Sequence, residues 1–222
     1  YKENILTSID TGTEDLLADV TAGIGVITLN RPEARNAMSG GMNAALSKTL
    51  AAWEFDPDVK CIVITGAGKG FCAGGDVKGM ASSGDGTVGQ NTIDGAIHAQ
   101  RVNQRSTAGK LFKMPKPTIA ALPGAAAGAG LSYALACDMR IMASTAIMTT
   151  AFAKVGFSGD YGGTYFLTQL VGTAKARELY YLSDRIDANE ALRLGLANWV
   201  VEPDKLMDKA MEIAGRISAG PT

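Results

Sequence analysis

The sequence is poor in the residues that most often build metal sites, disulfides and catalytic triads. Its 222 residues include one histidine, His98, and three cysteines, Cys61, Cys72 and Cys137. The lack of a C-x-x-C pair and of further histidines argues against a zinc centre. An odd number of cysteines indicates reduced thiols, and therefore a cytoplasmic protein. A single histidine also weakens any triad of serine, histidine and acid.

An excess of charge of either sign is also absent. Lysine and arginine number 21, aspartate and glutamate 22, and the formal net charge is −1. Nucleic-acid binding normally requires clustered basic residues, so we expect no nucleic-acid partner. Hydrophobic residues make up 46% of the chain and charged residues 19%, which predicts a globular domain that needs neither disulfides nor metals.

One uncharged run has the length of a membrane span but not its composition. Residues 117–137 carry no charge over 21 positions. About 20 predominantly apolar residues are needed to cross a bilayer. Here most are alanine or glycine, and Pro123-Gly124 interrupts them. We predict a buried strand, a turn and a buried helix, with no membrane partner. The first ten residues lack the apolar core of a signal peptide.

Strands and helices are predicted to alternate along the chain. A strand pair at 16–30 and buried strands at 60–66 and within 117–124 are separated by segments of helical period. The polar, glycine-rich residues 81–92 predict a mobile loop. This alternation indicates an α/β fold without repeats. Helices are predicted at 40–54, 93–113, 164–171, 173–182, 187–194 and 203–217.

Two buried strands each lead into a loop of small residues, in "CIVITGAGKGFCAGGD" and "TIAALPGAAAGAG". A dinucleotide fingerprint fits the first loop only weakly, because it does not follow the first strand of the chain. A P-loop is excluded because Gly70 follows Lys69. In the second loop, Ser132 resembles the serine of a nucleophile elbow, but His98 precedes it, which reverses the usual order.

A third interpretation joins both loops into an oxyanion hole. Backbone N–H groups at the start of a helix stabilise developing negative charge, provided that small residues allow close approach. Gly75 and Ala129 would supply these groups. The alternative is that small residues merely let helices pack against strands.

A third glycine-rich segment, "VGFSGDYGGTYF", contains a single carboxylate, Asp160. Aspartate is a favoured N-cap, so Asp160 could cap a helix that begins near Thr164. The other interpretation is an acid that points into a reaction site.

Four segments together resemble the enoyl-CoA hydratase/isomerase family, the crotonases. They are "NRPEARNAM", "GFCAGGDVK", "PKPTIAALPGAAAGAG" and "DRIDANEALRLGLANWVV", and the resemblance runs from about residue 16 to the end. It implies a crotonase-like spiral of ββα units over 1–202, followed by an incomplete C-terminal helical region at 203–222. It also implies an acyl-CoA thioester as partner, coenzyme A as part of the substrate with no separate cofactor, a role in fatty acid metabolism, and a homotrimer or hexamer.

The resemblance also assigns site residues. It places the thioester carbonyl between the N–H groups of Gly75 and Ala129, although the family usually has glycine at the second position. The positions that the resemblance implies for substrate binding are Glu33, Ala34, Ala73, Asp76, Val77, Gly128, Ser132 and Phe152.

Departures from the family pattern bear on the reaction. The two glutamates used by the family's hydratases (lyases) fall on Ser132 and Phe152, neither of which is a strong acid or base. Asp160 resembles an acid found in dienoyl-CoA isomerases, naphthoyl-CoA synthases and a dehalogenase. We therefore expect double-bond isomerisation with Asp160 as acid and base. Hydration of a 2-enoyl-CoA, nucleophilic attack by Asp160 and non-catalytic acyl-CoA binding are the alternatives.

Overall fold

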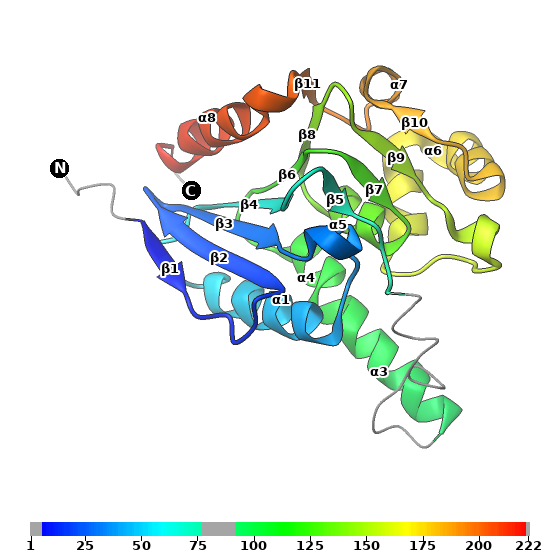
Figure 1. Ribbon diagram of the computed structural model, residues 1–222, viewed down its shortest axis with the longest axis horizontal. Coiled ribbons are helices and arrows are strands. Elements are labelled where there is room, and N and C mark those ends of the chain that lie inside the picture. Colours follow the sequence, from blue (N-terminus) through cyan, green and yellow to red (C-terminus); the bar gives the residue numbers. More distant parts are fainter. Residues whose placement is uncertain (1–5, 77–91, 221–222) are drawn as a thin grey trace.

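A computed structural model describes residues 6–76 and 92–220 (Figure 1). Val77 and residues 81–91 of the predicted loop lie outside this part of the chain. The larger of two sheets has the strand order β1-β2-β3-β4-β6-β8-β11. In this sheet β2 is antiparallel to both of its neighbours, β1 and β3, and every pairing from β3 to β11 is parallel. The strands are β1 (Thr7–Ile9), β2 (Leu16–Thr21), β3 (Ile24–Leu29), β4 (Cys61–Gly66), β6 (Thr118–Leu122), β8 (Met139–Ala143) and β11 (Trp199–Val201).

The smaller sheet consists of very short strands in the order β10-β9-β7-β5. These are β5 (Gly70–Cys72), β7 (Ala125–Ala127), β9 (Ile147–Thr149) and β10 (Ile186–Asp187). Each of β4, β6 and β8 in the large sheet is followed directly along the chain by β5, β7 or β9 in the small one. This repeated step confirms the predicted α/β spiral of ββα units.

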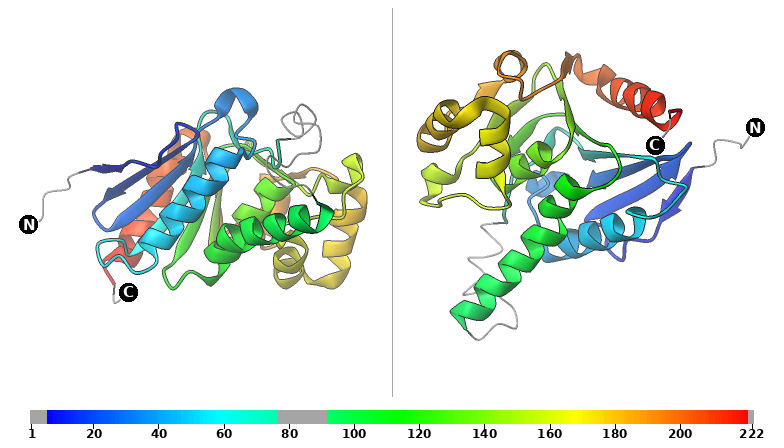
Figure 2. Two further views of the ribbon diagram at one scale, coloured as in Figure 1. Left: turned by 90° about the horizontal axis from the view of Figure 1, so that it is seen from below. Right: turned by 180° about the vertical axis from the view of Figure 1, so that it is seen from behind.

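Helices cover both faces of the large sheet. One face packs against α1 (Gly40–Trp53), α4 (Ala108–Lys113) and α5 (Ala129–Ala136), and the other against α8 (Leu206–Ser218). Figure 2 shows the sheet between α1 and α8. Successive residues of a strand point to opposite faces. Thus Ile62 and Ile64 of β4 join the core under α1, whereas Cys61 and Val63 join the core under α8.

The remaining helices carry the site or connect strands. They are η1 (Pro32–Ala34), α3 (Ile93–Ser106), η2 (Phe152–Val155), α6 (Gly163–Leu182), α7 (Ala188–Arg193) and η3 (Pro203–Lys205). None of the helices in residues 6–76 and 92–220 is long and apolar enough to cross a membrane. The proposed boundary between 1–202 and 203–222 stays a prediction.

The helices predicted at 164–171 and 173–182 are confirmed as the two segments of α6, because Gly172 between them has non-helical backbone angles, with φ 75° and ψ 167°. Other sequence-based boundaries were wrong. The helix predicted over 93–113 is broken at Thr107, whose backbone leaves the helical region and whose hydroxyl donates to Asn103 O at 2.6 Å. Both glycine loops also contain a strand of three residues, β5 or β7, which is too short for a periodic pattern to reveal.

Candidate active site

The two loops of small residues lie against each other after β5 and β7. Gly74 has a φ of +91°, and a Cβ added there would lie 2.9 Å from Ala127 O and 3.2 Å from Ala129 N. At Gly130, an added Cβ would lie 2.4 Å from Cys72 O. Only glycine at these two positions allows the loops to approach so closely.

Each loop presents a backbone N–H group. Ala129 is buried and is the first residue of α5, where N–H groups have no intrahelical acceptor. Gly75 pairs with Met38 in an isolated parallel bridge, in which Met38 N–H donates to Gly74 O at 2.8 Å. Among the described residues, no acceptor is paired with the N–H of either Gly75 or Ala129. The pair can therefore donate to a carbonyl oxygen that gains negative charge.

Asp160 lies in the turn that precedes α6, and its carboxyl group does not cap that helix. The N-cap is Gly162, and no side chain bonds to the helix start. The backbone of the turn is tied down instead, because Asp160 O accepts from Ser132 Oγ at 3.1 Å and from Gly163 N–H at 3.1 Å. Ser132, in the middle of α5, thus holds the acid-bearing turn against the helix that carries Ala129.

Among the described residues, only one of the two oxygens of the Asp160 carboxyl group has a hydrogen-bond partner. Oδ2 accepts from Gln100 Nε2 of α3 at 3.3 Å. Oδ1 is buried, and within the described part of the chain it is the one buried side-chain oxygen or nitrogen atom without a hydrogen-bond partner. Burial raises the pKa of Asp160 to about 6. Such a carboxyl group can both take up and release a proton near neutral pH.

Aromatic side chains surround this acid. The rings of Phe152 and Tyr180 stack with centroids 6.1 Å apart, and those of Tyr133 and Tyr161 meet edge to face at 5.6 Å. Asn43 links the second pair, since it accepts from Tyr133 Oη at 2.8 Å and donates to Tyr161 Oη at 3.3 Å. Burial, and to a smaller extent the charge of Asp160, raise the pKa of Tyr161 to about 12. This tyrosine therefore stays neutral while Asp160 titrates.

The structure brings several of the predicted site residues together. Ser132 is buried, and a Cβ added at Gly128 would lie 3.8 Å from the ring of Phe152. Asp76, next to Gly75, forms an ion pair with Arg31 at 3.1 Å, so its charge is balanced. The described carboxylates Asp76 and Asp160 thus differ, the first being paired with an arginine and the second not.

The predicted contacts with coenzyme A remain predictions. Ala73 is exposed, and its N–H donates to Arg35 O at 3.0 Å, which joins the first glycine loop to the segment of η1. Glu33 is exposed and Ala34 is half-buried in η1.

Sequence reasoning missed Gln100, Asn43 and Tyr180. Gln100 reaches Asp160 across 60 positions of the chain, and Asn43 reaches Tyr161 across 118. Neither contact has a local sequence signal. At the start of α6, Phe166 is buried and Tyr165 is exposed.

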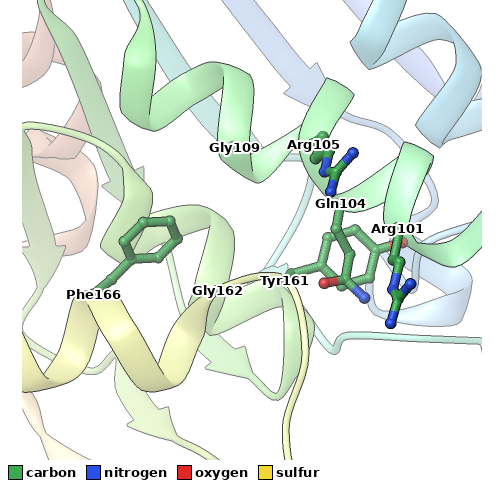
Figure 3. A pocket seen from close by; sticks show the side chains of 7 residues that line it. All are labelled: Arg101, Gln104, Arg105, Gly109, Tyr161, Gly162 and Phe166. Carbon is green, nitrogen blue, oxygen red and sulfur yellow. The ribbon is translucent and has the colours of Figure 1, made fainter.

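A cavity of about 210 Å³ lies on the α3 side of this site (Figure 3). It shares Tyr161 with the surroundings of Asp160. Its lining residues are Arg101, Gln104, Arg105, Gly109, Tyr161, Gly162 and Phe166. Among the described residues, no group of three histidine, cysteine or acidic side chains is arranged to hold a metal ion.

Comparisons with known proteins identify the family of this chain. The sequence model of the family described as "Enoyl-CoA hydratase/isomerase" matches residues 19–222. The chain is 36% identical over 209 residues to the 1,2-epoxyphenylacetyl-CoA isomerase of Escherichia coli, a match that covers 94% of this chain and 78% of that protein. It is 38% identical over 198 residues to the short-chain-enoyl-CoA hydratase of Clostridium acetobutylicum, covering 87% and 71%.

Solved structures give the same result. The crystal structure of an enoyl-CoA hydratase from Bacillus anthracis superimposes with a TM-score of 0.84 at 34% identity, covering 93% of this chain and 77% of that one. Together with the two loops and their N–H groups, these similarities show that the chain belongs to the enoyl-CoA hydratase/isomerase family.

Proposed function

We propose that this protein moves the double bond of an enoyl-CoA thioester, with Asp160 as both base and acid. The observation that supports the proposal is the half-buried Asp160 carboxyl group, which lies near aromatic rings and whose buried Oδ1 has no hydrogen-bond partner among the described residues. The two positions that would carry a hydratase's glutamates hold Ser132 and Phe152 instead. A 1,3 proton shift needs one group that accepts a proton and returns it, which Asp160 can provide alone.

The proposed steps follow from this arrangement. The thioester carbonyl accepts hydrogen bonds from the N–H groups of Gly75 and Ala129, which makes the Cα protons of a 3-enoyl ester more acidic. Ionised Asp160 removes a Cα proton, and the electron pair of that bond delocalises into a dienolate whose oxygen remains in the oxyanion hole. Asp160 then returns the proton to Cγ, which gives the conjugated 2-enoyl ester. No water or other reactant is consumed.

Hydration is the second candidate, because relatives such as the Clostridium acetobutylicum protein are named hydratases. In this reaction Asp160 would have to activate a water molecule and also supply the proton for Cα. The resemblance aligns Phe152 with the second glutamate of the family's hydratases, and a phenyl ring cannot transfer a proton. Isomerisation requires only one proton-transferring group. One relative, from Escherichia coli, is also named an isomerase.

The test combines product analysis with an isosteric variant. Incubation with a panel of 2-enoyl- and 3-enoyl-CoA esters should change thioester conjugation at constant mass, whereas added water would indicate hydration. Asp160→Asn should lower kcat by about 100- to 10,000-fold, the range for loss of a general base, while binding of a saturated acyl-CoA stays nearly unchanged. Asp184→Asn, at an exposed position, is the matched control. Wild-type turnover in Asp160→Asn would rule out the proposed role.

A further inference from the structure

Two arginines line the cavity beside Asp160 without partners in the described part of the chain. Arg101 and Arg105 lie four residues apart on exposed α3, so their side chains emerge from the same face of that helix. Neither guanidinium group forms an ion pair or a hydrogen bond with residues 6–76 or 92–220. Figure 3 shows both on one side of the cavity and Phe166 on the opposite side.

This cavity lies next to Asp160, because it is lined by neighbours of Asp160 and of Gln100. Gln100 donates to Asp160 Oδ2, and Gln104, one helical turn later on the same face of α3, lines the cavity. Tyr161, the residue after Asp160, lines it as well. A chain that passes Asp160 along α3 therefore enters the space between Tyr161 and Phe166.

The lining combines apolar walls with positive charge. The rings of Tyr161 and Phe166 and the backbone of Gly109 and Gly162 give apolar surface, and the two guanidinium groups are the charged members. Guanidinium binds a carboxylate through paired, charge-assisted hydrogen bonds. Arg105 lies in the last turn of α3, where a positive charge interacts favourably with the helix dipole. Arg101 lies one turn earlier, so the helix dipole does not account for its charge.

We propose that this cavity binds the far end of the acyl group, and that the preferred substrates are CoA esters whose acyl chain ends in a carboxylate. The proposal rests on the proposed function, which places the reacting carbons at Asp160. The cavity of about 210 Å³ is smaller than the roughly 300 Å³ at the lower end for whole ligand sites. It therefore suits the end of a chain rather than a complete ligand.

The helix sets the length of chain that would reach the arginines. The four residues from Gln100 to Gln104 span about 6 Å of helix axis. An acyl chain of roughly six to eight carbons is therefore needed to place a terminal carboxylate beyond Asp160. Shorter dicarboxylic esters should gain less from the arginines.

The test compares two esters that differ only in the terminal group. Binding of adipoyl-CoA and hexanoyl-CoA would be measured by calorimetry for the wild-type protein, Arg101→Gln, Arg105→Gln and the double variant. We expect the wild-type protein to prefer adipoyl-CoA by about tenfold, as a partly exposed charge-assisted pair allows. Each single variant should lose most of this preference and keep its affinity for hexanoyl-CoA. Arg177→Gln, which removes an exposed arginine of α6 outside the cavity, should behave as wild type.

Equal wild-type affinity for the two esters, or a preference that survives in the double variant, would overturn the assignment. Because both esters are saturated, binding is measured without isomerisation. An adipoyl-CoA preference in a protein that never isomerises an enoyl-CoA would therefore refute the proposed function and support the binding site. Isomerisation of an enoyl-CoA without a preference for adipoyl-CoA would support the proposed function and refute the binding site.

Discussion

At Asp160, a carboxyl group combines partial burial with the lack of a positively charged partner among residues 6–76 and 92–220. Asp76, by contrast, forms an ion pair with Arg31. Within the same described ranges, the Asp160 carboxyl group receives only a neutral amide donor, from Gln100. Its ionised form is therefore less stabilised than that of a surface aspartate, because burial removes water without supplying a counter-charge. This difference is what makes Asp160 suited to proton transfer.

The elevated pKa of Asp160 predicts a definite pH profile. Burial raises the pKa to about 6, so the carboxyl group is protonated and unable to act as base below that pH, and ionised above it. We expect kcat/KM for isomerisation to rise as the pH increases through about 6 and then to level off. Initial rates across a pH series with a 3-enoyl-CoA ester measure this directly.

The control for the pH profile is the residual activity of Asp160→Asn, which should lack this rise. A profile that stays flat between about pH 5 and pH 8 would show that no group with such a pKa limits the reaction.

At the scale of elements, the proposed oxyanion hole depends on how closely two loops approach. Gly74, which follows β5, lies where its missing side chain leaves room for the turn that begins α5. Near Asp160, Gly163 must also lack a side chain, because a Cβ there would lie 2.4 Å from Ser132 Oγ and 2.7 Å from Tyr180 Oη. Glycines therefore set the spacing between β5, α5 and α6, and with it the distance from the oxyanion hole to the acid.

Adding a methyl group at Gly74 should disrupt the oxyanion hole. In Gly74→Ala, the new Cβ would lie 2.9 Å from Ala127 O, and alanine is strained at a φ of +91°. The second loop must shift, which moves the N–H of Ala129 away from the thioester oxygen. We expect kcat to fall by about 100-fold or more, as for loss of one oxyanion donor.

Gly70→Ala is the matched control for this change, since an added Cβ there meets nothing within 4 Å. It should keep nearly full turnover. Circular dichroism would confirm that both variants are folded. A folded Gly74→Ala protein with wild-type kcat would show that the spacing of the loops is not critical.

The same elements show what the sequence could and could not predict. The apolar runs of β4 and β6 identified the strands correctly. The small residues after them correctly indicated that the two loops approach closely, whereas the role of Gly75 and Ala129 beside a reacting carbonyl stays a prediction. The role of Asp160 as a cap was open, and the structure excludes it, because Gly162 occupies the cap position. Gln100 could not be predicted, because only the packing of α3 against the turn brings it to Asp160.

At the scale of the whole molecule, the candidate site and the apolar cluster under α8 lie on opposite faces of the large sheet. The side chains around Asp160 belong to the face covered by α1, α4 and α5, whereas α8 covers the other face. On that second face, Leu206, Ala210, Ile213 and Ala214 of α8 pack on Val63, Ile119 and Ile141 of the sheet. A change in α8 should therefore affect the free energy of unfolding without altering the geometry of the site.

Ile213→Ala tests this separation. Ile213 is 5% exposed in the apolar cluster under α8, and its truncation should lower the free energy of unfolding by about 2 to 4 kcal/mol through lost burial and a residual cavity. Well below the unfolding transition, kcat should remain within about twofold of wild type, because folded molecules keep the site intact. Denaturant unfolding and initial rates on the same preparation measure the two quantities. Arg216→Ala, at an exposed position of α8, should change neither. A large loss of kcat in folded Ile213→Ala would show that the packing of α8 is transmitted through the sheet to Asp160.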